Sequence, residues 1–108
     1  MGIMDRFIRS DINAGVAKCR ADPEGVLVDV REPQEYEHRR IPGSVNLPLS
    51  LIDTVTSVYP DKTRHLYLYC YSGARSGQAA AYLRRQGYTN VLDIGGIKGY
   101  TGETERGA

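Results

Sequence analysis

The stretch LYLYCYSGARSGQAAAYL, residues 66–83, joins a strand pattern to a helix pattern through a short glycine-containing loop. The alternating run 65–70 predicts a strand that ends at Cys70, and the alanine-rich run 75–87 predicts a helix. Arginines in the last turn of this helix and Gly87 beyond it suit a helix C-terminus. A strand that leads directly into a helix predicts an α/β unit, with a thiol at the carboxyl end of its strand.

Short apolar runs elsewhere in the chain alternate with helix patterns at the spacing of parallel strands joined by crossovers. The run 26–30 is apolar on both faces apart from Asp29, which is typical of a strand buried in a parallel sheet. We therefore predict an open α/β/α layer with a mainly parallel sheet of about five strands flanked by helices. The predicted strands cover residues 6–8, 26–30, 45–47, 65–70 and 90–96.

Three further helical segments are predicted between these strands. Ser10 suits the N-cap of the first, and Pro33 suits the first turn of the second, over residues 32–40. The buried face of the first helix is predicted to contain Ile12, Val16 and Cys19. The buried face of the third, over 49–59, is predicted to contain Leu51, Ile52, Val55 and Val58. The tail from about residue 101 is expected to fray.

The length and composition are those of one globular domain. The 108 residues contain 41% hydrophobic and 25% charged residues, so we predict a single domain over residues 1–108. The net charge of +1 provides no basic field, and neither nucleic acid nor membrane is expected as a partner. The N-terminus has no signal-peptide pattern, and Arg6 breaks the myristoylation motif, so a cytoplasmic location is expected.

The residues after Cys70 have the features of an anion-binding cradle. They are Tyr71, Ser72, Gly73, Ala74, Arg75 and Ser76. Gly73 and its small neighbours let the backbone curl so that several N–H groups point inward, next to the positive end of a helix. These donors and Arg75 would stabilise a thiolate, which predicts that Cys70 is a nucleophile. The alternative is a small buried residue that ends a core strand.

Neither histidine of the chain lies in this loop. His38 is the only candidate that a distant segment could bring to Cys70, whereas His65 begins a strand and is predicted to be exposed or half-buried. Activation by backbone dipoles and Arg75 is the simpler hypothesis. The two cysteines form no CxxC pair, so a metal site is not expected and free thiols are predicted.

Several motifs in one order resemble the rhodanese family of sulfurtransferases, in particular its single-domain members. They are VLVDVREPQEY (26–36), IPGSVNLP (41–48), YCYSGARS (69–76), AAAYLRRQGYTNV (79–91) and DIGGIKGY (93–100). The resemblance implies that Cys70 takes a sulfane sulfur from a small anionic donor such as thiosulfate and becomes a persulfide. It then passes the sulfur to cyanide, to a thiol or to an acceptor protein, and no cofactor is needed.

In this mechanism the amides of residues 71–76 hold the transferred sulfur, while Arg75 attracts the donor and steadies the leaving sulfite. The second hypothesis is a sulfur relay or protein-binding module in which thiosulfate turnover is incidental. The third is a phosphatase or arsenate reductase. In that class five residues separate the cysteine from the arginine, whereas four separate Cys70 from Arg75.

Other positions carry weaker predictions. Asp29 and Arg31 match the family and are predicted to form a supporting polar pair at the end of a buried strand, with direct substrate contact by Arg31 as the alternative. Arg39 and Arg40 replace the Gly and His of the family's GHIPG motif, and we interpret them as a charged helix end rather than as part of the pocket. Cys19 is predicted to be a core residue, with a disulfide to Cys70 as the alternative.

Overall fold

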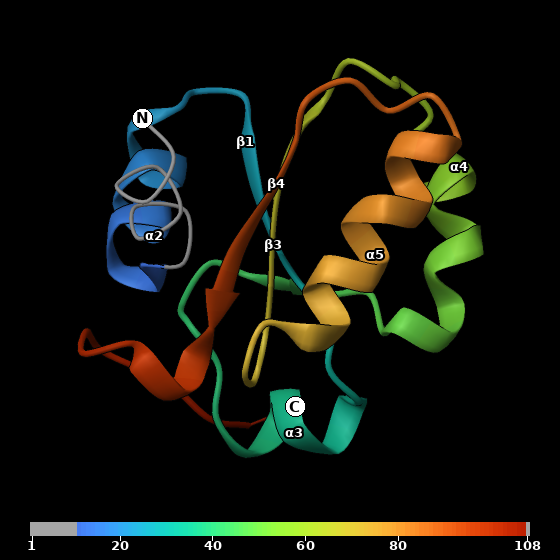
Figure 1. Cartoon of the computed structure of the whole chain (residues 1–108). Helices are drawn as coiled ribbons and strands as arrows, with labels where there is room; N and C mark the ends of the chain where they lie inside the picture. Colours follow the sequence, from blue (N-terminus) through green and yellow to red (C-terminus); the bar gives the residue numbers. More distant parts are fainter. Residues whose placement is uncertain (1–10, 108) are drawn as a thin grey trace.

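The computed structural model describes residues 11–107, which form a parallel four-stranded sheet with helices on both faces (Figure 1). The strands are β1 (Gly25–Asp29), β2 (Val45–Asn46), β3 (His65–Cys70) and β4 (Val91–Gly96), in the order β2-β1-β3-β4. The predicted α/β/α class is confirmed, but within residues 11–107 the sheet has four strands rather than the five predicted. The predicted strand at 6–8 and the predicted N-cap Ser10 lie outside the described residues.

Helix α2 (Ile12–Ala21) covers one face of the sheet, and α5 (Ala74–Arg85) covers the other together with α4 (Val55–Val58) and the 3₁₀ helix η1 (Leu49–Thr54) (Figure 1). The carboxylate of Asp11 caps α2 by accepting from the N–H groups of residues 13 and 14. The predicted inner face of α2 is confirmed, because Ile12, Val16 and Cys19 are all buried.

The predicted helix face over 49–59 is wrong at two of its four positions. Ile52 and Val55 are buried, but Leu51 and Val58 are each 52% exposed. The segment is not one α-helix: η1 is interrupted by non-helical torsion angles at Leu51, and α4 follows it. Because a 3₁₀ helix turns every 3.0 residues, the spacing of an α-helical face is lost across this junction.

The C-terminal tail also differs from the prediction, since residues 101–107 are attached to the domain. The backbones of Arg40 and Glu105 exchange two hydrogen bonds of 2.9 and 3.0 Å, and the Arg40 side chain donates to the Glu105 carboxylate over 3.1 Å. At the start of the tail, Thr101 N–H donates to Asn13 over 3.0 Å. Arg40, which was predicted to belong to a charged helix end, therefore anchors the tail.

All strand pairs in this sheet are parallel, so the carboxyl ends of the strands lie at one edge. Asp29 lies beside Tyr69, and Cys70 lies beside Gly96. The short helices α3 (Pro33–His38) and η2 (Ile97–Gly99) follow β1 and β4 at this edge (Figure 1). The edge thus gathers the loops that continue from three different strands. None of the helices among residues 11–107 is long and apolar enough to span a bilayer.

Candidate active site

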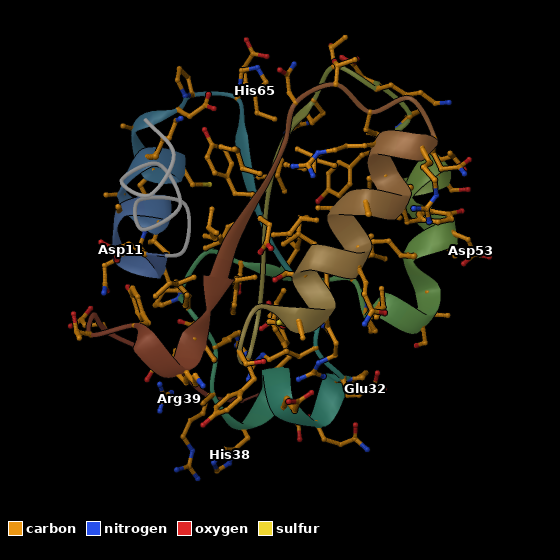
Figure 2. All side chains as sticks on the ribbon, in the orientation of Figure 1. Asp11, Glu32, His38, Arg39, Asp53 and His65 are labelled. Atoms are coloured by element: carbon orange, nitrogen blue, oxygen red, sulfur yellow. The ribbon has the colours of Figure 1, made fainter. Side chains whose placement is uncertain are left out.

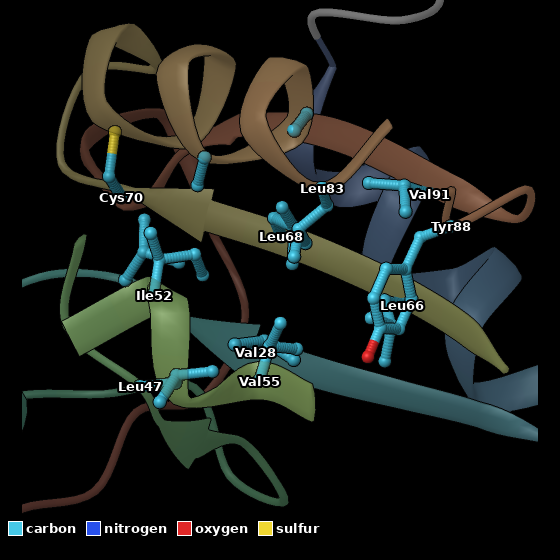
Figure 3. Packing of buried hydrophobic residues seen from close by; sticks show 13 residues of the cluster. Val28, Leu47, Ile52, Val55, Leu66, Leu68, Cys70, Leu83, Tyr88 and Val91 are labelled. Atoms are coloured by element: carbon cyan, nitrogen blue, oxygen red, sulfur yellow. The ribbon is translucent and has the colours of Figure 1, made fainter. Parts of the chain in front are cut away.

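Cys70 is the last residue of β3, and its sulfur is directed toward the first turn of α5 (Figure 3). Side chains alternate along a strand, so Leu66, Leu68 and Cys70 face α5, while Tyr67 and Tyr69 pack on the α2 side. Cys70 has no exposed surface. The strand period therefore aims the thiol at the positive end of a helix rather than into solvent.

The loop after Cys70 is shorter than predicted, because α5 already begins at Ala74. Gly73 is the N-cap residue and has φ +101°, a left-handed conformation that favours glycine. In this conformation its N–H donates to the Cys70 sulfur over 2.9 Å. The predicted cradle of residues 71–76 is thus half loop and half helix. Its helical part supplies first-turn N–H groups, which have no acceptor within the helix.

Gly96 supports the loop from behind. A Cβ atom at this position would lie 2.1 Å from the carbonyl oxygen of Tyr71 and 2.6 Å from the Cα of Ser72, so no other residue fits without displacing the loop. The N–H of Lys98 donates to the same Tyr71 carbonyl over 3.1 Å. The Tyr71 side chain itself is exposed, at the outer side of the loop. The junction of β4 and η2 therefore fixes the backbone that follows the thiol.

Arg75 forms an ion pair with Glu35, a residue of α3 that was not predicted from the sequence. The two guanidinium nitrogens donate to the two carboxylate oxygens over 2.6 and 3.0 Å. Glu35 also accepts from the N–H of Glu32 in a capping box, a pattern visible in the sequence as two glutamates three residues apart. The hydrogen bond from Arg75 lowers the pKa of Glu35 to about 2. Arg75 is therefore charge-compensated, and its contact with an anionic donor stays a prediction.

Asp29 and Arg31 form a buried ion pair at the end of β1. Their exposed fractions are 0% and 4%, and the guanidinium donates to the two carboxylate oxygens over 3.0 and 2.7 Å. Arg31 also donates through its backbone N–H to the same carboxylate and through its side chain to the carbonyl of Arg39. The pair thus ties β1 to the end of α3, and its guanidinium has little surface left for a substrate.

Ser76 and Asp93 form a second polar contact behind the thiol. Ser76 lies in the first turn of α5 and is fully buried. Its hydroxyl lies 2.7 Å from a carboxylate oxygen of Asp93 on β4 and 3.5 Å from the Cys70 sulfur. Ser76 is one of the predicted cradle residues, whereas Asp93 was not predicted from the sequence. Val91 packs on the α5 side of the sheet, and a residue two positions later on a strand faces the same side. A charged residue at such an inward-facing position was the signal that could have identified Asp93.

The remaining candidates lie away from the thiol. His38 and Arg39 are exposed, and His65 lies at the opposite end of the sheet, where it contacts Asp22 over 2.7 Å (Figure 2). Arg40 packs over the ring of Tyr36 and anchors the tail, so it is not a free cation. Within the part of the chain that the structure describes, no hydrogen bond joins a histidine to Cys70. Among residues 11–107, no three His, Cys, Asp or Glu side chains are grouped as metal ligands would be.

Cys19 lies in the core on the other face of the sheet from Cys70. This position contradicts the alternative of a disulfide between them, because the sheet separates the two sulfurs. Burial, together with the charge of Asp22, raises the pKa of Cys19 to about 11, so this thiol stays protonated at neutral pH.

Known proteins are similar to this chain in sequence and in structure. Residues 13–103 match the family described as rhodanese-like domain. A protein of Allochromatium vinosum named sulfurtransferase is 51% identical over 79 residues, which cover 71% of this chain and 73% of that protein. Thiosulfate sulfurtransferase PspE of Escherichia coli is 38% identical over 72 residues, covering 66% and 69%. A solved structure, "rhodanese with anions from E. coli", has TM-score 0.70 at 34% identity and covers 76% of this chain and 98% of its own.

Proposed function

Because this chain belongs to the rhodanese-like domain family, whose members compared above include named sulfurtransferases, we propose that it transfers sulfane sulfur through a persulfide on Cys70. The observation that carries the proposal is the environment of the thiol. Cys70 ends a strand, accepts a hydrogen bond of 2.9 Å from Gly73 N–H and faces the first turn of α5. Donors aimed at a sulfur atom stabilise its anion, which is the attacking form.

In the first half-reaction the Cys70 thiolate attacks the outer sulfur of thiosulfate. A bond forms between the two sulfurs, the bond to the sulfonate sulfur breaks, and sulfite leaves with the electron pair. In the second half-reaction cyanide or a thiolate attacks the outer persulfide sulfur, and Cys70 leaves as a thiolate. The N–H groups of Gly73 and of the first turn of α5 carry the electrostatic stabilisation, since Glu35 already compensates Arg75.

The buried position of Cys70 favours narrow reactants. Because its side chain has no exposed surface, a reactant needs a narrow, unbranched end to reach the sulfur, as the terminal sulfur of thiosulfate has. Cyanide, small thiols and an extended cysteine-bearing segment of a protein all satisfy this condition as acceptors. The same cradle with one more residue between cysteine and arginine would suit phosphate, so a phosphatase remains the competing chemistry to test.

The test is thiocyanate formation from thiosulfate and cyanide, with Cys70→Ser as the inactive variant and Cys19→Ser as the matched control on the other face of the sheet. We expect loss of activity only in Cys70→Ser, and mass spectrometry should find one added sulfur on Cys70 after thiosulfate treatment. Full activity in Cys70→Ser contradicts the proposal.

Two further outcomes separate the alternatives. Loading of Cys70 by a persulfide donor but not by thiosulfate would favour a sulfur relay. Hydrolysis of an aryl phosphate that depends on Cys70 would favour the phosphatase.

A further inference from the structure

The hydroxyl of Ser76 has one proton and four neighbouring acceptors. Its oxygen lies 2.7 Å from Asp93 Oδ1, 3.1 Å from the carbonyl of Gly73, and 3.5 Å from both the Cys70 sulfur and the carbonyl of Gly95. A hydroxyl donates one hydrogen bond and accepts two. Asp93 is both the nearest acceptor and the charged one, so the Ser76 hydroxyl donates its hydrogen bond to Asp93, and a lone pair of Ser76 faces Cys70 while that residue is a neutral thiol.

Asp93 is placed for this contact by an irregularity in β4. Leu68 pairs with Asp93, but the next residue of β3, Tyr69, pairs with Gly95, so one extra residue lies in β4. Such bulges re-aim side chains next to functional sites. Gly77 of α5 lies directly against the carboxylate, since a Cβ there would be in van der Waals contact with Asp93 Oδ2 at 3.4 Å.

The carboxylate does not depend on Ser76 alone. It also accepts from Gly95 N–H over 3.1 Å, and its side chain is only partly buried. Asp93 therefore keeps a donor and access to water when the Ser76 hydroxyl turns away. If the carboxylate were fully buried and had Ser76 as its single donor, breaking the hydrogen bond from Ser76 would cost much more free energy.

We propose that Asp93 is a positioning residue that controls the Cys70 thiolate through the hydroxyl of Ser76. The hydroxyl donates to Asp93 while Cys70 is a thiol and rotates to donate to the sulfur when Cys70 is a thiolate. The proton stays on Ser76 throughout, and no covalent bond changes. Since Asp93 competes for this donor, the thiolate is less stabilised and more nucleophilic than one that holds the donor alone.

Other charged groups also surround the thiol, and none of them acts through this hydroxyl. Arg75 of α5 interacts electrostatically with Cys70, with Glu35 of α3 and with Asp29 of β1. Glu35 compensates Arg75, and Arg31 compensates Asp29. The competing explanation is that Asp93 acts on Cys70 only through its charge across space, independently of Ser76.

A pH profile of alkylation separates the two explanations. Iodoacetamide modification of Cys70 is measured in a Cys19→Ser background for the parent, Asp93→Asn, Ser76→Ala and the double variant. We expect Asp93→Asn to move the midpoint of the rate profile down by about one pH unit, the size of one hydrogen bond to a charged group. Its plateau rate should fall because the better-stabilised thiolate is a weaker nucleophile.

Ser76→Ala should move the midpoint up, and adding Asp93→Asn to it should then cause no further shift. An Asp93→Asn shift of the same size with and without Ser76 overturns the proposal, as does the absence of any shift in a folded single variant. Asp93→Ala, checked for folding by circular dichroism, repeats the test without an amide that could hydrogen-bond Ser76.

The control of Cys70 by Asp93 has a role in catalysis only if the proposed sulfur transfer is correct. The alkylation experiment does not depend on sulfur transfer. Alkylation requires only the thiol, so a protein that forms no thiocyanate yet shows the Ser76-dependent shift refutes the proposed function alone. An active sulfurtransferase without that shift refutes the role of Asp93 alone.

Discussion

Replacing Arg31 with Met removes the partner of a carboxylate that has no exposed surface. Asp29 then keeps the hydrogen bond from the backbone N–H of residue 31 but loses the guanidinium contacts of 2.7 to 3.1 Å. Methionine retains much of the apolar stem, so the loss is mainly of charge and hydrogen bonds. Breaking a buried ion pair from one side costs about 3–5 kcal/mol, which is a large part of the roughly 5–15 kcal/mol that stabilises a domain.

At about 4–8 °C per kcal/mol for a domain of this size, Arg31→Met should lower Tm by at least about 12 °C. Urea denaturation gives the free energy of unfolding, and the double variant Asp29→Asn/Arg31→Met is the matched control. It should recover much of the loss, because neither partner is then left charged and unpaired.

Exposed ion pairs contribute up to about 1 kcal/mol. If Arg31→Met lowers the free energy of unfolding by less than this amount, the reasoning is refuted. Activity adds a second check. If the folded variant is stable but its KM for thiosulfate rises strongly, then Arg31 contacts the donor, and the interpretation of the pair as purely structural is wrong.

Three other variants or measurements test separate contacts. Glu35→Gln should lower the free energy of unfolding by only about 1 kcal/mol at neutral pH, because solvent screens the ion pair with Arg75. Since the pKa of Glu35 is lowered from 4.5 to about 2, this contribution is complete above pH 4.5 and is lost as the pH falls through about 2, so urea curves of variant and wild type should converge there. Cys19 should resist iodoacetamide in the folded protein at neutral pH, because burial raises its pKa to about 11; rapid labelling found by peptide mass spectrometry would contradict this. Tyr69→Phe should cost about 1–3 kcal/mol because the buried N–H of Ile41 loses its acceptor at 3.1 Å, with faster exchange of that amide in NMR spectra as the specific sign.

The sequence predicted best those features whose causes are local. The period of β3 and the glycine after it were sufficient to place Cys70 at a strand end before a helix, and the structure has β3 and α5 within one residue of the predicted bounds at most ends. The apolar spacing of α2 identified its buried face for the same reason. The error at Leu51 and Val58 arose where the helix type changes, because spacing alone does not distinguish a 3₁₀ turn from an α-helical one.

What the sequence alone determined is the thiol, its loop and the α/β order of the chain, since hydrogen-bonding patterns and turn preferences act over a few residues. Only the tertiary structure decided which charges surround the thiol. Glu35 reaches Arg75 across 40 positions of the chain, and Asp93 reaches Ser76 across 17 positions through a bulge in β4. Such contacts depend on strand register and on how α3 and α5 pack at the edge of the sheet, which are collective properties of the folded chain.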